Sequence, residues 1–118
     1  MNNNPDLAVC NQNLLAMRDT LDILGGKWKL QILHYLTANE NNDNTFKKIE
    51  RGISGISAKM LSKELKDLEQ NELVSRKVIS GKPVTVEYAI TEYGKSTGII
   101  TQKLVDWGIT HRKRILGK

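Results

Sequence analysis

Apolar side chains recur with the period of an α-helix along the first part of the chain. In the first such segment the recurring positions are Leu14, Met17, Leu21 and Leu24, followed by the pair Gly25-Gly26. Glycine ends helices readily, so we expect a turn at this pair and a new helix after it. Three further helices are expected at Lys27–Thr37, Thr45–Arg51 and Ala58–Asn71, with a polar loop over 38–44.

The helix expected at Ala58–Asn71 has two different faces. With about 3.6 residues per turn, Leu61, Leu65 and Leu68 fall on one stripe, which predicts a buried side. The opposite side is polar and basic, and its residues are Lys59, Ser62, Lys63 and Lys66. Ser57 is placed to cap the start of this helix. We expect the leucine stripe to pack against Trp28, Ile32, Leu36, Phe46 and Ile49.

Beyond Asn71 the apolar period changes from about 3.6 to about 2 residues, which is the period of a β-strand. The alternating apolar positions are Val84, Val86, Tyr88 and Ile90. The segment Leu73–Ile79 is rich in Val and Ile and predicts the antiparallel partner, with the turn at residues 80–83 and Lys82 at its tip. A final helix is expected from the capping residue Thr91 to Arg114.

Three short helices followed by a two-stranded hairpin are the outline of a winged helix-turn-helix. We therefore expect a mainly α-helical fold with one small β-hairpin. The expected domain covers residues 13–114, after a flexible leader over 1–12 and before a tail over 115–118. In this fold the last of the three helices lies in the major groove of DNA and the hairpin reaches the backbone beside it.

The composition is that of one soluble domain with a basic surface. The chain has 118 residues, of which 39% are hydrophobic and 26% charged, and its formal net charge is +5. That charge fits a polyanionic partner without requiring one. The N-terminus lacks a basic signal region and no apolar run is long enough to span a membrane, so we expect a cytoplasmic protein that makes no membrane contact.

Catalytic and metal-binding patterns are missing from the sequence. Cys10 is the single cysteine, and His34 and His111 fall in separate expected helices, so no metal site is predicted. Neither a Ser-His-Asp or Cys-His arrangement nor a phosphate-binding glycine loop is suggested. We expect no enzymatic activity and no cofactor.

Basic residues are expected to converge on double-stranded DNA from three elements. The helix expected at Ala58–Asn71 is the recognition helix of this fold, the one that lies in the major groove. It contributes Lys59, Ser62, Lys63 and Lys66, with Ser57 at its N-terminal end. The hairpin contributes Arg76, Lys77 and Lys82, and the preceding helix contributes Lys47, Lys48 and Arg51 as supporting backbone contacts. Lysines on phosphates supply affinity, whereas side chains that reach base edges supply sequence preference. Two alternatives remain open: a merely solvated basic face, and a winged helix that binds another protein instead of DNA.

Four blocks of the sequence resemble those of the HxlR-type winged helix-turn-helix transcriptional regulators, a branch similar to the MarR proteins. The blocks are LDILGGKWKLQIL, FKKIERGISGISAKMLSKELKDLEQNELVSR, PVTVEYAITEYG and LVDWG. The resemblance covers about residues 10 to 112. Departures from the pattern are a longer loop over 37–44, Ala58 where proline often opens the recognition helix, and Asn11 where proline often follows the cysteine.

The resemblance implies a homodimeric repressor or activator whose dimer is built from the N-terminal and C-terminal helices. The interface residues it implies are Leu14, Met17, Ile100, Leu104 and Trp107. The sequence agrees to the extent that the final helix is apolar on more than one side. A twofold dimer places two recognition helices ~34 Å apart and predicts a pseudo-palindromic operator. The alternative is that the two helices pack on each other within one chain.

Cys10 occupies about the position at which this family often carries a cysteine that senses oxidants or electrophiles. The resemblance therefore implies a possible redox sensor. The neighbouring sequence offers no positive charge before Arg18, so the alternative of a small incidental thiol stays open. The sequence does not indicate any small-molecule effector.

Overall fold

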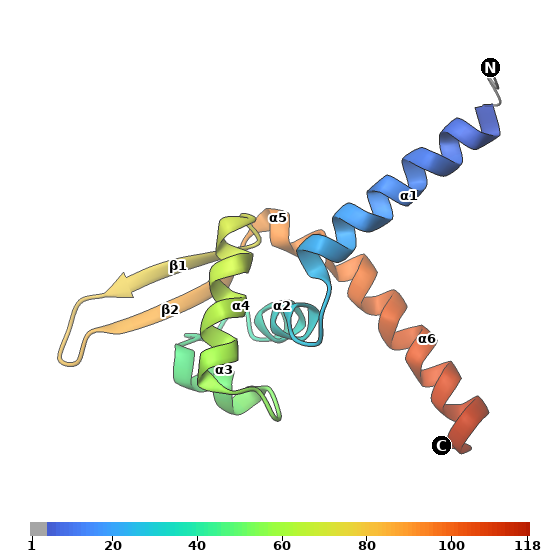
Figure 1. Ribbon diagram of the computed structural model, residues 1–118. Coiled ribbons are helices and arrows are strands. Elements are labelled where there is room, and N and C mark those ends of the chain that lie inside the picture. The colour runs from blue at the N-terminus through green and yellow to red at the C-terminus, as the bar shows by residue number, and fades with distance from the viewer. Residues whose placement is uncertain (1–4) are drawn as a thin grey trace.

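The computed structural model describes residues 5–118 and confirms the expected fold class. Its elements in chain order are α1 (Pro5–Leu24), α2 (Lys29–Ala38), α3 (Phe46–Gly52), α4 (Ala58–Gln70), β1 (Val74–Ile79), β2 (Thr85–Ile90), α5 (Glu92–Lys95) and α6 (Gly98–Leu116). Helices α2, α3 and α4 and the hairpin form the body of the molecule, and α1 and α6 project from it (Figure 1).

The core lies where α2, α3, α4 and the base of the hairpin meet. Its fully buried side chains are Ile32, Leu33, Leu36, Ile49, Leu61, Leu65, Leu68 and Val74. The predicted leucine stripe of α4 is therefore confirmed as the buried side of that helix. Trp28 and Phe46 are only partly buried, and they pack against this cluster from its edge. Burying each large apolar side chain contributes about 1.5 to 3 kcal/mol to folding, so the stripe fixes which side of α4 faces outward.

Hydroxyl side chains cap the starts of α3 and α4, as predicted for Ser57. The Thr45 hydroxyl oxygen accepts from the Lys48 amide at 3.3 Å, and the Ser57 oxygen accepts from the Met60 amide at 3.1 Å. Each bond satisfies an amide that the helix itself cannot pair. Between α3 and α4 the chain turns at Gly55, whose φ of +87° favours a residue without a Cβ.

The hairpin is antiparallel, in a register that pairs Val74 with Ile90 and Ile79 with Thr85. Strand β2 also touches the start of the helix-turn-helix, since the Tyr88 amide donates to the Asn44 carbonyl at 2.9 Å. An isolated bridge between Thr45 and Glu87 extends this contact. These bonds hold the base of the β1–β2 hairpin, the wing of this fold, against the loop that leads into α3.

Two predicted boundaries are wrong. Helix α1 begins at Pro5, so residues 5–12 are helical rather than a flexible leader; proline and an acidic residue are both favourable in a first turn. Residues 1–4 of the predicted leader lie outside the described residues. Helix α6 continues to Leu116, so the predicted tail over 115–118 shortens to two residues, with the end marked by Gly117 at φ +72°.

The single long helix predicted from Thr91 to Arg114 is divided into α5 and α6. The Ser96 hydroxyl donates to the Tyr93 carbonyl at 2.5 Å, and the Thr97 hydroxyl donates to the Gly94 carbonyl at 2.7 Å. Hydroxyl side chains that bond nearby backbone offer an alternative to the regular helical ladder. The break lets α6 leave the body of the molecule in a new direction (Figure 1).

The molecule is elongated. Its radius of gyration is 17.7 Å, whereas a compact domain of this length is expected to have about 13.5 Å. The excess comes from α1 and α6: the end of α1 lies near the start of α6, and the two helices diverge toward their free ends (Figure 1). No residue of α6 is buried. The alternative that these two helices pack on each other along their length within one chain is therefore wrong.

Candidate nucleic-acid interface

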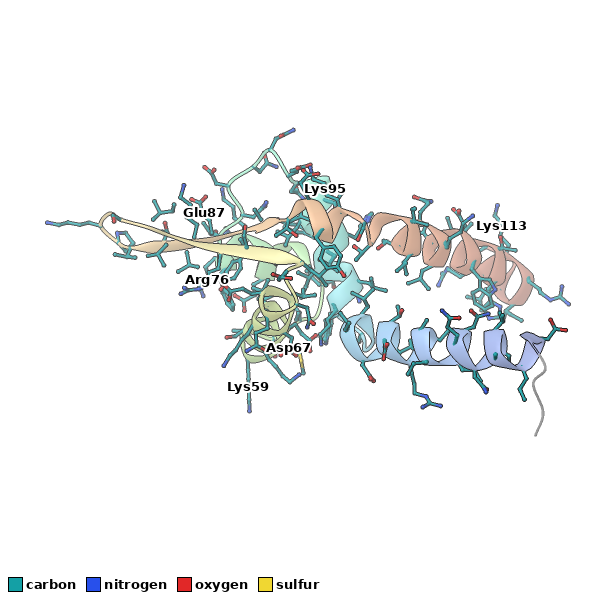
Figure 2. All side chains as sticks on the ribbon, turned by 90° about the horizontal axis from the view of Figure 1, so that it is seen from above. Lys59, Asp67, Arg76, Glu87, Lys95 and Lys113 are labelled. Atoms are coloured by element: carbon teal, nitrogen blue, oxygen red, sulfur yellow. The ribbon has the colours of Figure 1, made fainter. Side chains whose placement is uncertain are left out.

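The basic side of α4 is exposed as its period predicts. Lys59, Ser62, Lys63 and Lys66 are all exposed, while the leucines on the other side are buried. Lys59 extends away from the body of the molecule (Figure 2). Ser57 is exposed too, and its side-chain oxygen is engaged in capping the helix. A rigid helix therefore presents its polar side to solvent.

An ion-pair cluster at the middle of α4 joins this helix to α2. The Lys29 ammonium, on the first residue of α2, lies 2.6 Å from a Glu64 carboxylate oxygen and 3.5 Å from Oδ2 of Asp67. Lys63 reaches the same two acids, at 3.6 Å from Glu64 and 3.3 Å from Oδ2 of Asp67. Lys29 and Glu64 are buried, with 11% and 9% of their side-chain surfaces exposed. A buried pair of this kind fixes the orientation of α4 on α2.

The cluster shifts the pKa of two of its members. Desolvation lowers the pKa of Lys29, but the hydrogen bond and charge of Glu64, together with Asp67, outweigh it, so the pKa lies above its ordinary value. Desolvation raises the pKa of Asp67, but hydrogen bonds and charges from Lys63 and Lys29 outweigh it and hold the pKa below its ordinary value. Both shifts favour the charged forms of the pair.

The lysines of α4 are consequently not equivalent. Lys63 is paired with acids of its own helix, whereas Lys59 and Lys66 have no ion-pair partner within residues 5–118. Their charges are fully available to a ligand. Sequence reasoning grouped these lysines because they share one face, but which of them is neutralised depends on Asp67 and on a lysine from another helix.

Only some of the basic residues predicted on the hairpin lie on the side that faces α4. Arg76 faces Tyr88 across the hairpin and Lys77 faces Glu87, and neighbouring residues of a strand point to opposite faces. In Figure 2, Arg76 lies on the side of the hairpin that carries Lys59, and Glu87 lies on the other side. Lys77 therefore belongs to the face turned away from α4. Lys82 is exposed in the turn at the tip.

The basic residues of α3 lie in two different surroundings. Lys47 is 81% exposed and lies 3.8 Å from Glu50. Lys48 and Arg51 line an open hollow of about 650 Å³, together with Tyr35 and the asparagines of the loop over 41–44. The longer loop noted in the sequence thus forms one wall of a polar depression next to two cations.

The projecting helices carry the residues expected at a dimer interface. The exposed fractions are 45% for Leu14, 55% for Met17, 37% for Ile100, 54% for Leu104 and 69% for Trp107. A group of large exposed apolar side chains on neighbouring turns is typical of a protein–protein contact surface. Trp107 stacks on His111 with ring centroids 4.7 Å apart. Lys113, further along α6, lies far from Lys59 (Figure 2), so the basic run over 111–114 is remote from the α4 face of its own chain.

Cys10 is exposed on α1. Within residues 5–118 no cluster of His, Cys, Asp and Glu is arranged to hold a metal ion. In the same part of the chain, no helix combines the length and the apolar character needed to cross a membrane.

Known proteins with similar sequences share this arrangement. The model of the HxlR-like helix-turn-helix family matches residues 23–115. The chain is 35% identical over 103 residues to the HTH-type transcriptional regulator YtcD of Bacillus subtilis, covering 87% of this chain and 79% of that protein. It is 38% identical over 91 residues to the HTH-type transcriptional regulator YodB of the same organism, covering 77% of this chain and 79% of that protein.

Two solved structures extend the similarity to the fold. The reduced form of the redox regulator HypR has a TM-score of 0.75 at 29% identity, covering 87% of this chain and 99% of that one. A quinone-bound structure of YodB from B. subtilis has a TM-score of 0.64 at 34% identity, covering 80% of this chain and 97% of that one. The matched proteins regulate transcription and are not enzymes. Because the family match spans the helix-turn-helix, the hairpin and most of α6, the chain belongs to the HxlR-like helix-turn-helix family of transcriptional regulators.

Proposed function

We propose that this regulator binds a pseudo-palindromic operator in double-stranded DNA as a homodimer, with α4 in the major groove and the hairpin along the backbone. The observation that carries the proposal is that Lys59 and Lys66, on the exposed side of a helix whose other side is buried, have no ion-pair partner among residues 5–118. A fixed helix with unneutralised cations meets the two needs of groove recognition, which are a defined register and attraction to phosphates.

The basic residues then take different roles. Lys59 and Ser62, in the N-terminal half of α4, are assigned to base edges, with Lys66 and Lys63 beside them. Ser57 and the α4 N-terminus are assigned to a phosphate, which the positive end of a helix favours. Arg76 and Lys82 are assigned to the backbone along the wing. Lys48 and Arg51 are assigned to the backbone at the loop hollow, whereas Lys77 and Lys47 are expected to contribute less.

The homodimer is supported by the exposed apolar side chains of α1 and α6. A chain of this size has no further core to cover them, and a second copy offers a complementary set. Two such subunits would present their α4 helices ~34 Å apart, which is one turn of DNA. The basic run over 111–114 would then lie on α6, in the part of the molecule proposed to form the dimer.

Fluorescence anisotropy with labelled DNA from upstream of the regulator's own gene tests the proposal. Lys59→Ala and Lys66→Ala should each weaken binding and flatten the plot of log affinity against log salt by about 0.9 per subunit, because each removes a positive charge that displaces counterions from the duplex. A base-specific role for Lys59 would appear as a further loss that is larger on the operator than on random DNA. Lys118→Ala removes the same charge beyond the end of α6 and is the matched control. Equal binding by all three variants and wild type would refute the assignment of α4.

We further propose that Cys10 makes DNA binding sensitive to oxidants. The proposal is supported by the exposure of Cys10 and by the similarity to HypR, a redox regulator, and to YodB, which has been solved bound to a quinone. The chain has a single cysteine, so a disulfide must join Cys10 to a second chain or to a small thiol.

Diamide should therefore weaken operator binding by wild type and leave Cys10→Ser unaffected. Mass spectrometry under non-reducing conditions should detect the linked species only when Cys10 is present. If both proteins keep their affinity after diamide treatment, or lose it equally, Cys10 is not the sensor.

A further inference from the structure

Lys63 is held by two acids on its own helix and is at the same time open to solvent. Its ammonium lies 3.3 Å from Oδ2 of Asp67 and 3.6 Å from Oε1 of Glu64, while 65% of its side-chain surface is exposed. Exposed ion pairs contribute little to stability because water competes with them. The contact is therefore weak enough for a stronger anionic ligand to displace it.

The other cation of the cluster is buried and more closely paired. Lys29 is buried between α2 and α4, and its strong contact is the one to Glu64 at 2.6 Å, whereas its contact to Asp67 is longer, at 3.5 Å. Lys29, Lys63, Glu64 and Asp67 together carry no net charge. If Lys63 turns toward DNA, Asp67 keeps only the longer contact to Lys29 and leaves a negative charge on the recognition helix.

Resting on the proposed function, we propose that Asp67 is a positioning residue that withholds Lys63 from non-specific DNA. A phosphate offers Lys63 a single anionic contact much like the one that Asp67 already provides. A correctly placed guanine edge adds two acceptors, N7 and O6, to the attraction of the neighbouring phosphates, so it displaces the carboxylate more readily than a phosphate alone does. Asp67 therefore lowers affinity for random DNA more than affinity for the operator, and so raises the specificity ratio.

Asp67→Asn tests this inference, because a gain in DNA affinity is a result that structural damage does not produce. With a fluorescein-labelled random-sequence duplex, the variant should bind about threefold more tightly at low salt. Its plot of log affinity against log salt should become steeper by about 0.9 per subunit, as one more phosphate is neutralised. Affinity for DNA from upstream of the regulator's own gene should rise less.

Glu69→Gln is the matched control, because it removes the same charge from an exposed position of α4 that has no ion-pair partner among the described residues. Its salt dependence on random DNA should stay near that of wild type. Adding Lys63→Ala to Asp67→Asn should abolish the gain. Asp67→Ser, measured in parallel, should give the same gain and covers the case in which Asp67→Asn folds poorly.

The inference fails if Asp67→Asn and Asp67→Ser bind random DNA no more tightly than Glu69→Gln, or if the gain persists without Lys63. Failure of the proposed function looks different. In that case the wild-type protein itself shows no salt-dependent binding to any duplex, and no variant changes that result.

Discussion

At the scale of single residues, the buried pair of Lys29 and Glu64 determines how α4 is presented. The two residues are 35 positions apart in sequence and 2.6 Å apart in space. A buried ion pair adds little net stability compared with apolar side chains, but removing one partner leaves an uncompensated charge in the interior. The value of this pair is therefore the orientation it gives to the recognition helix.

Replacing Lys29 with Met should lower the free energy of unfolding by about 3 to 5 kcal/mol, because Glu64 loses its buried partner. Urea denaturation followed by circular dichroism measures the loss. Lys66→Met, which removes an exposed and partner-free lysine from α4, should change stability by no more than about 0.5 kcal/mol. Adding Glu64→Leu to Lys29→Met should restore most of the loss, and an equally unstable double variant would contradict the explanation.

Asp67 predicts a specific loss of stability in acid. Its pKa is below the ordinary value of 3.8 in the folded chain, so its ion pairs stabilise the protein above pH 3.8 as long as the lysines stay protonated. This contribution disappears as the pH falls below 3.8 through the folded pKa. Urea midpoints at pH 7 and pH 3 should therefore differ less in Asp67→Asn than in wild type. An identical difference between the two urea midpoints in both proteins would show that other carboxylates account for the loss of stability in acid.

At the scale of elements, the periods and capping residues predict most of the fold. The three helices of the motif begin and end within two residues of the predicted positions, and both strands pair as expected. These features are local, because the spacing of leucines and the hydroxyls of Thr45 and Ser57 are read directly from the sequence. The division of the last helix is only partly local. Besides the hydroxyl bonds of Ser96 and Thr97, it is accompanied by the close packing of Gly94 in α5 against Leu73, the residue before β1.

Gly94→Ala should destabilise the protein by about 1 to 3 kcal/mol or more. A Cβ at this position would lie 2.1 Å from the Leu73 carbonyl oxygen, a backbone atom that also accepts from the Thr91 amide. Gly98→Ala is the matched control, since a Cβ there meets nothing within 4 Å and alanine favours the helix. Thermal unfolding should show a lower midpoint for Gly94→Ala and an unchanged or higher one for Gly98→Ala. A normal midpoint for Gly94→Ala would mean that α5 shifts freely.

The sequence predicted which side of α4 is exposed, but it did not predict which charged side chains pair with one another. The helical period identified the exposed side of α4, and the positions of lysines and arginines identified the other candidates. The period could not show that Lys29 crosses from α2 to neutralise Glu64, since tertiary packing brings the two together. The alternation of strand β1 does imply that Arg76 and Lys77 point to opposite faces, but which of them faces α4 is set by how the hairpin sits on the core.

At the scale of the whole molecule, the two projecting helices separate the proposed assembly surface from the proposed DNA surface. Helices α1 and α6 extend to one side of the body and the hairpin extends to the other (Figure 1). Because no residue of α6 is buried, a substitution on this helix should alter the proposed subunit pairing with little effect on the core. Assembly and folding can therefore be tested independently.

Leu104→Glu should convert the proposed dimer into a monomer. Leu104 is 54% exposed and belongs to the apolar side of α6, so a carboxylate there opposes pairing without disturbing the core. Multi-angle light scattering should give a mass near the 13.3 kDa of one chain, and operator affinity should fall because the two half-sites are no longer bound together. Gln102→Glu, on the other side of α6, should keep the mass of two chains. A wild-type mass of one chain would overturn the dimer.

The divergence of α1 and α6 also bears on how long a subunit survives. An isolated helix of this length is marginal in water, and in a single chain neither helix has a neighbour along its outer half (Figure 1). An unpaired subunit is therefore expected to fray at both ends and to offer proteases extended segments, which the proposed dimer would cover. Turnover should then be fastest when the regulator is scarce, so that unassembled copies are removed before they accumulate on DNA.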